Sequence, residues 1–246
     1  MKNKGIVLII VVIIIVIALF GASMYQKSKT RGDLAKQIFS LGDGVSPVTL
    51  EELRASIAAN EKEIERFVET AAKTGIYWKI LAARLADRGL HGEALEALKR
   101  AIYYSPEDPS LHYSAGISAG ILGKSFHSFP GRENIEREQY NYFAEQSFLR
   151  AIELDSRYLR PRYSLGVLYV FELDRPEDAI PHLQRCLEIS RNDVDVMFVL
   201  ARAFYMLEGF QEALDLYDRI ITITRDEQKR ADAQNNRQMV LGLMNG

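Results

Sequence analysis

The side chains most often used for nucleophilic catalysis or metal binding are few in this chain, which has four histidines and one cysteine. None of the histidines lies at metal-ligand spacing from another histidine or from Cys186; they are His91, His112, His127 and His182. A single cysteine cannot form a disulfide within the chain, so we interpret Cys186 as a small core residue. The sequence also has no glycine-rich phosphate loop and no nucleophile elbow. We therefore predict a protein that is not an enzyme and that uses no cofactor and no metal.

The charge balance argues against nucleic acid as a partner. The chain has 31 Lys and Arg residues and 33 Asp and Glu residues, a formal net charge of −2. Surfaces that bind nucleic acid usually carry a basic stripe that neutralises phosphates. We expect no nucleic-acid binding from a mildly acidic chain without such a stripe.

The N-terminal segment, residues 5–24, is apolar and contains no charged residue. A helix of this length rises about 30 Å, which matches the hydrocarbon core of a bilayer. We therefore predict a transmembrane signal anchor over residues 1–25. A cleaved signal peptide is the alternative, with residues 21–23 as a weak cleavage site.

Basic residues on both sides of this segment bear on its orientation. Lys2 and Lys4 favour a cytoplasmic N-terminus, whereas Lys27, Lys29 and Arg31 favour the reverse. A short basic start followed by an apolar run is the usual layout of a signal anchor. We therefore expect a single-pass protein of the inner (cytoplasmic) membrane with its soluble domain in the periplasm.

The segment after the span is rich in charges and glycines, and we interpret residues 26–48 as a linker. Thr49 and Glu52 have the spacing of a helix capping box. Apolar residues then recur at helical spacing from Leu53 to Ala71. These signals predict an N-terminal flanking helix over residues 49–74.

From residue 75 the sequence repeats with a period of about 34 residues, which is typical of paired helices stacked in an array. Large anchors, small residues at helix crossings and a terminal proline recur in a fixed order. In the first unit these are Trp78, Leu81, Ala82, Leu85, Ala94, Leu98, Ala101 and Pro106. The chain resembles the tetratricopeptide-repeat (TPR) family in this pattern, and in particular bacterial membrane-anchored TPR proteins.

The resemblance implies an all-α fold, in which the transmembrane helix is followed by an α-solenoid of helix-turn-helix repeats. The units are expected at residues 75–108, 109–158, 159–193 and 194–227, with a C-terminal capping helix at 228–246. The second unit contains an insertion at about residues 123–140. We interpret this insertion either as a partner-contacting loop or as a tolerated, solvent-exposed one.

In TPR domains the first helix of each unit lines a concave groove that binds other proteins. The resemblance implies that the second, fifth, ninth, twelfth and thirteenth positions of each unit face this groove. Some of these side chains have the alternative of packing between helices. The partner-binding residues expected on this basis are Lys79, Tyr113, Arg160, Tyr163, Phe171, Phe198, Arg202 and Tyr205.

The resemblance thus implies a membrane-anchored scaffold for protein–protein interaction. We expect it to assist the assembly or stability of a cell-envelope complex such as a flagellar or secretion machine. Its partners would be proteins in the groove and at the 123–140 loop, and the membrane at residues 5–24. The alternative is a non-catalytic docking subunit of a membrane enzyme, or a chaperone accessory at the translocation channel.

Overall fold

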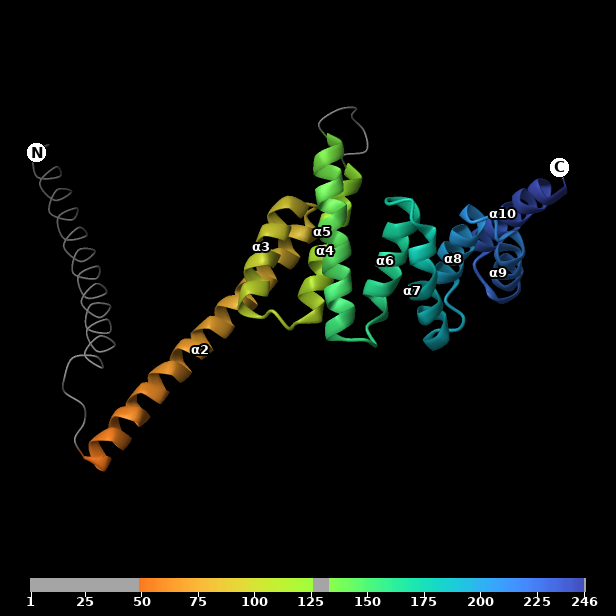
Figure 1. Cartoon of the computed structure of the whole chain (residues 1–246). Helices are drawn as coiled ribbons and strands as arrows, with labels where there is room; N and C mark the ends of the chain where they lie inside the picture. The colour runs from red at the N-terminus through yellow and green to blue at the C-terminus, as the bar shows by residue number, and fades with distance from the viewer. Residues whose placement is uncertain (1–48, 126–132, 246) are drawn as a thin grey trace, which may run out of the picture. The chain divides into compact units, whose positions relative to one another are not determined.

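The computed structural model describes residues 49–125 and 133–245, and their regular structure is entirely helical (Figure 1). The predicted all-α fold is therefore confirmed for this part of the chain. By contacts the chain divides into two compact units, Met1–Phe67 and Val68–Gly246. The helices are α2 (Leu50–Asp87), α3 (His91–Tyr104), α4 (Pro109–Ser125), α5 (Glu133–Leu154), α6 (Leu159–Phe171), α7 (Pro176–Ile189), α8 (Val194–Met206), α9 (Phe210–Ile223) and α10 (Glu227–Asn245).

The predicted membrane span at residues 5–24 and the linker at residues 26–48 lie outside the described residues. Among the helices that the structure does describe, none is both long enough and apolar enough to cross a membrane.

The predicted capping box at the start of α2 is present. The Glu52 backbone N–H donates to Thr49 Oγ1, and the Thr49 N–H donates to Glu52 Oε2, both at 3.2 Å. These two bonds satisfy backbone donors that a helix start would otherwise leave without a partner.

The predicted helix end near residue 74 is wrong, because α2 continues without a break to Asp87. A single glycine inside a helix costs only about 1 kcal/mol. Gly75 is buried, and a Cβ added there would lie 2.8 Å from Cβ of Tyr104 in α3. Gly75 therefore allows a close approach of the two helices rather than ending one of them.

The end of α2 is instead set by Gly89, whose φ of +75° is left-handed. The Gly89 N–H donates to the Ala86 carbonyl and the Leu90 N–H to the Leu85 carbonyl, at 2.9 and 3.0 Å. This pair of bonds is the Schellman motif, which ends many helices at a glycine.

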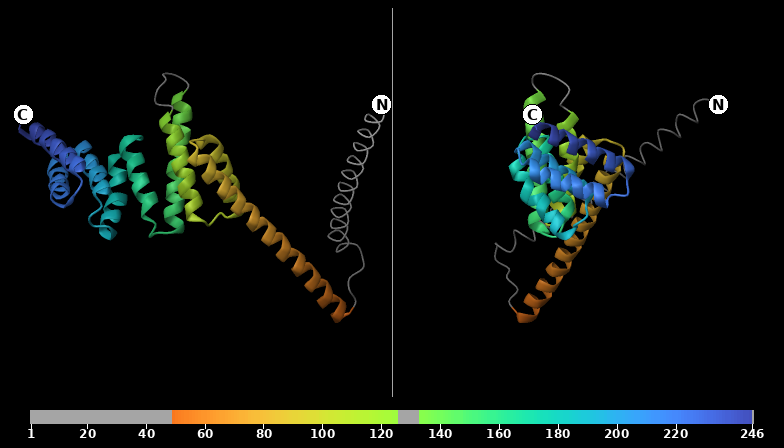
Figure 2. Two further views of the ribbon diagram at one scale, coloured as in Figure 1. Left: turned by 180° about the vertical axis from the view of Figure 1, so that it is seen from behind. Right: turned by 90° about the vertical axis from the view of Figure 1, so that its right-hand side faces the viewer.

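Within the compact unit Val68–Gly246, successive helices pack against their sequence neighbours, as Figures 1 and 2 show for α3 to α10. Ala82, Ala94 and Ala101, predicted for the first repeat, are at most 1% exposed, as are the alanines at matching crossings in later repeats: Ala115, Ala144, Ala151, Ala179 and Ala213. Two glycines allow still closer crossings. A Cβ on Gly116 would lie 2.5 Å from the Phe148 ring, and one on Gly166 would lie 2.6 Å from Leu183.

The insertion predicted at residues 123–140 is not wholly a loop. Its first residues complete α4, which ends at Ser125, and its last residues begin α5, which starts at Glu133. Residues 126–132 lie outside the described ranges. Residues 135–140 contain neither glycine nor proline, so nothing in their sequence opposes a helix. The early part of α5 also has a tertiary contact, because Arg137 donates to the Glu172 carbonyl at 3.1 Å.

The last helix, α10, keeps the register of the repeats. Lys229 at its start pairs with Asp195, which lies 34 residues earlier at the start of α8. The Asp226 carboxylate caps α10 by accepting from the backbone N–H groups of Gln228 and Lys229, at 2.9 and 3.1 Å. The helix predicted to cap the array thus occupies the place that the first helix of a further unit would take.

Candidate functional site

Hollows lie between the first helices of successive pairs, and one of them lies between α4 and α6. We call this hollow the α4–α6 groove; its volume is about 980 Å³. Its lining is mostly apolar and includes Gly116, Ile117, Gly120, Ile121 and Lys124 of α4, Phe148 of α5, and Tyr163, Val167 and Phe171 of α6.

A glycine on α4 helps to explain why this groove is open. A Cβ added at Gly120 would meet no atom within 4 Å, so the space beside it is empty. Gly116, one turn earlier, also lines the groove, but the Phe148 ring occupies the space where its Cβ would lie. The groove therefore owes part of its width to the missing side chain at Gly120.

A second hollow lies between α8 and α10, and we call it the α8–α10 pocket. Its volume is about 270 Å³, and its lining includes Phe171, Phe198, Arg202, Tyr205, Asn236 and Met239. Phe171 is 53% exposed and lines both hollows. The two hollows are therefore adjacent, with Phe171 between them.

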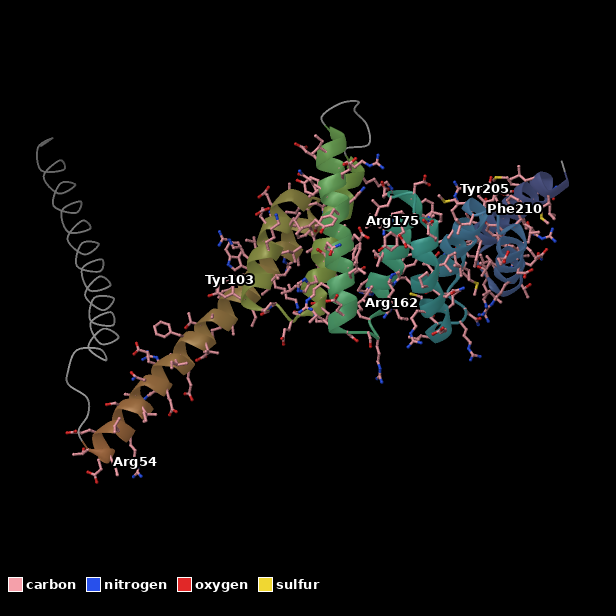
Figure 3. All side chains as sticks on the ribbon, in the orientation of Figure 1. Arg54, Tyr103, Arg162, Arg175, Tyr205 and Phe210 are labelled. Atoms are coloured by element: carbon pink, nitrogen blue, oxygen red, sulfur yellow. The ribbon has the colours of Figure 1, made fainter. Side chains whose placement is uncertain are left out.

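Charged groups at the α8–α10 pocket are held by their neighbours. The Arg202 guanidinium lies over the Tyr205 ring, 5.1 Å from its centroid, a cation–π contact. Tyr205 packs in turn on Phe210, with ring centroids 6.2 Å apart (Figure 3). Nearby, the hydrogen bond from Lys229 to Asp195, at 2.5 Å, raises the pKa of Lys229 above its ordinary value.

Tyr163 carries the one phenol of the α4–α6 groove, and its environment keeps it neutral. Burial raises the pKa of Tyr163, and the negative charge of Asp195 raises it further. The phenol is therefore a neutral donor and acceptor at any physiological pH.

A polar network of α5, α6 and the turn before α7 joins adjacent pairs of helices. The Tyr169 hydroxyl donates to Glu145 Oε1 at 2.9 Å, and Arg175 donates to the same oxygen at 3.0 Å. The Arg175 guanidinium also lies over the Tyr169 ring, 4.8 Å from its centroid. Burial and the hydrogen bond to Glu145 raise the pKa of Tyr169. The network holds α6 against both neighbours and so fixes the groove-lining face of α6.

Five of the predicted partner-binding residues line these hollows. Tyr163 and Phe171 line the α4–α6 groove, and Phe198, Arg202 and Tyr205 join Phe171 in the α8–α10 pocket. Their role in partner binding stays a prediction.

The other three predicted residues line neither hollow. Lys79 donates to Asp108 at 2.7 Å and to Ser110 at 2.9 Å. Burial of Asp108 favours its neutral form, but hydrogen bonds from Lys79 and Ser110 outweigh this effect and lower its pKa. Tyr113 packs between aromatic rings, with centroids 6.1 Å from Phe148 and 5.3 Å from Tyr158. Arg160 is exposed at the start of α6.

Several lining residues were absent from the predicted set: Gly116, Gly120, Ile121, Lys124, Asn236 and Met239. Gly120 and Ile121 occupy the twelfth and thirteenth positions of the second unit, so the repeat register alone could have identified them. Asn236 and Met239 belong to α10, which was expected to cap the array rather than to line it. Within the described ranges, no cluster of three or more His, Cys, Asp or Glu side chains could hold a metal ion.

Comparison with known proteins supports the same architecture. A sequence model described as "Tetratricopeptide repeat" matches residues 170–235. A "TPR repeat-containing protein" of Borreliella burgdorferi is 21% identical over 193 residues, which cover 78% of this chain and 82% of that protein. Anaphase-promoting complex subunit 3 of Schizosaccharomyces pombe is 28% identical over 142 residues, which cover 58% of this chain but only 19% of the subunit.

Among solved structures, the fold resembles YrrB, described as "a TPR protein with an unusual peptide-binding site". The TM-score is 0.57 at 20% identity, and the match covers 74% of this chain and 83% of YrrB. At this level of identity the likeness concerns the fold alone.

Proposed function

The chain belongs to the tetratricopeptide-repeat family, and from this premise we propose that it is a scaffold that binds an apolar segment of a partner protein in the α4–α6 groove. The observation that carries the proposal is the groove itself, with its volume of about 980 Å³ and its mostly apolar lining. Apolar surface that stays exposed in a folded protein usually marks a binding site.

The lining of the two hollows indicates the chemistry of that segment. Aromatic side chains on rigid helices, such as Tyr163, Phe171 and Phe198, are typical anchors of protein interfaces because they lose little entropy on binding. Arg202 adds positive charge at the pocket, whereas the groove has both a cation, Lys124, and a carboxylate, Glu172. We therefore expect an amphipathic helix or an extended strand with apolar anchors and an acidic residue. The peptide-binding site named for YrrB supports this choice of ligand class.

We further propose that the scaffold is tethered to the inner membrane by residues 5–24 and that the array lies in the periplasm. The support comes from the uncharged apolar stretch and its basic flanks. In this setting the scaffold would assist the assembly of a cell-envelope complex. The alternative is a docking subunit of a membrane enzyme or of a chaperone system.

Photocrosslinking in cells tests the groove. A benzophenone side chain in place of Phe171 should crosslink to a partner, and mass spectrometry should locate the bond in an apolar segment of it. The control places the same group at Tyr103, which is 79% exposed on α3 and lines neither hollow. This variant should not crosslink to the partner. A partner with a catalytic domain would favour the docking-subunit alternative.

A matched pair of glycine variants gives the control. Gly120→Leu fills the groove without a clash, because a Cβ there meets nothing within 4 Å, and should abolish the crosslink. Gly242→Leu adds the same side chain to α10, again where nothing lies within 4 Å, and should leave the crosslink unchanged. A crosslink that survives Gly120→Leu would refute binding in the groove.

Protease accessibility tests the membrane proposal. In cells whose outer membrane has been permeabilised and whose inner membrane is intact, added protease should digest the array. The chain should also remain in the membrane fraction after alkaline carbonate washing. Release by carbonate, or protection of the array until the inner membrane is broken, would contradict the tether or its orientation.

A further inference from the structure

The N-terminal part of α2 carries an apolar stripe that no described residue covers. We define the α2 stripe as Leu50, Leu53, Ile57, Ile64 and Phe67, whose exposed fractions are 72, 42, 53, 60 and 58%. Every residue from 50 to 62 is exposed, polar and apolar alike. Helices in proteins gain most of their stability by packing an apolar face against another element.

The spacing of the stripe is that of a coiled coil. When Asn60 is counted with its members, the positions are separated alternately by three and four residues, which places Leu50, Ile57 and Ile64 at a positions and Leu53 and Phe67 at d positions. Isoleucine at a with leucine at d favours two-stranded parallel coils. The remaining d position is taken by Asn60.

Asn60 determines which partner suits the stripe. In a parallel, in-register pair, the d positions of the two helices face each other, so the Asn60 amides of two copies can hydrogen-bond together. In an antiparallel pair, a faces d, and Asn60 would face a leucine or an isoleucine. A buried amide without a partner is costly, which disfavours that arrangement and also a purely apolar partner.

The charges beside the stripe are compatible with the same pairing. In a parallel coil, a g residue faces the e residue five positions later in the other helix. Ser56 at g then faces Glu61 at e, and Thr49 at g faces Arg54 at e, so neither pair brings like charges together. Figure 3 labels Arg54 in this part of α2.

We propose that the α2 stripe binds a second copy of this chain as a parallel, in-register two-stranded coiled coil with Asn60 facing Asn60. The helix does not need to be nucleated for this, because residues 50–67 continue a helix whose other end packs in the array through Gly75, Trp78 and Ala82. The proposal is independent of what the α4–α6 groove binds.

Disulfide trapping tests the pairing and its direction in the full chain, either in its membrane or in mild detergent. Asn60→Cys should form a disulfide-linked dimer under a mild oxidant, with twice the mass of 27.9 kDa. Lys62→Cys, on the opposite side of the helix, should yield at most a trace. The native Cys186 does not interfere, because it is buried. Equal yields from the two variants, or no dimer from Asn60→Cys, would overturn the proposal.

The antiparallel alternative has its own signature. Leu53→Cys mixed with Ile64→Cys should form heterodimers only if the helices run in opposite directions. A heterodimer yield above that of Asn60→Cys would overturn the parallel arrangement. In the parallel coil, each of these single variants instead crosslinks to itself.

Sedimentation in detergent measures the strength of the association. Ile57→Glu should weaken self-association by at least roughly 100-fold, because it removes an apolar contact and adds two facing carboxylates. Ala55→Glu adds the same charge on the opposite side of the helix and should change the association by less than about threefold. Both sites are exposed, so neither substitution should unfold the chain. Equal effects of the two variants would overturn the proposal.

Discussion

Gly116 and Gly120 lie one turn apart on α4, yet substitution by alanine should have opposite effects at the two sites. Alanine is favoured over glycine inside a helix by about 1 kcal/mol. At Gly120 the new Cβ meets nothing within 4 Å, so that gain should appear in full. At Gly116 the Cβ would lie 2.5 Å from Cε1 and 2.6 Å from Cδ1 of Phe148, which is itself 3% exposed.

The magnitudes follow from these contacts. Overpacking a closed site costs about 1–3 kcal/mol, which outweighs the gain in helix propensity. Gly116→Ala should therefore destabilise the array by about 1 kcal/mol, whereas Gly120→Ala should stabilise it by a similar amount. For a domain of this size, 1 kcal/mol shifts Tm by about 2–4 °C, so the two variants should lie on opposite sides of the wild type.

Thermal and urea unfolding of the purified chain, followed by circular dichroism, measure both variants. Gly116→Ala combined with Phe148→Leu provides a control, because the smaller side chain should relieve the clash and give a favourable coupling energy. If Gly116→Ala raises Tm as Gly120→Ala does, the packing described between α4 and α5 is wrong.

Three further predictions concern the titratable and polar groups. Tyr169→Phe should lower the free energy of unfolding by about 1–2 kcal/mol in urea denaturation, because the part-buried Glu145 loses the hydroxyl that donates to it; an unchanged value would contradict that bond. Burial and the positive charge of Arg162 lower the pKa of His182 below its unfolded value, so the unfolded chain binds more protons near pH 6. Stability should therefore fall as the pH falls through about 6.5, and His182→Gln should remove that part of the pH dependence in unfolding experiments between pH 7.5 and 5.5. Burial raises the pKa of Cys186 to about 11, so iodoacetamide at pH 8 should label the unfolded chain and leave the folded one unmodified by mass spectrometry.

The repeat register was predictable from sequence because it depends on side-chain size. Close helix crossings require small side chains. The residues at three such crossings, Ala94, Ala101 and Ala179, are fully buried. The capping box of Thr49 was equally predictable, since the residues that form it are three apart.

Features that depend on distant contacts were not predictable in this way. Glycine often ends a helix, so the sequence suggested that Gly75 does so. Only the close approach of Tyr104 shows that Gly75 is a site of close packing. Likewise, Lys79 was expected to contact a partner protein, but it bonds to Asp108, 29 residues later, in the turn before α4. The sequence positions of Gly123 and Glu133 did not reveal that the insertion lengthens α4 and α5.

Phe171 is a wall of both the α4–α6 groove and the α8–α10 pocket, so one side-chain rotation changes the shape of the two hollows together. A ligand that selected one rotamer in the groove would therefore alter the affinity of the pocket for a second ligand. By thermodynamic reciprocity, the second ligand must alter the affinity of the groove by the same factor. Under the proposed function, the binding of one partner segment would then depend on the binding of another, without any large rearrangement of the helices.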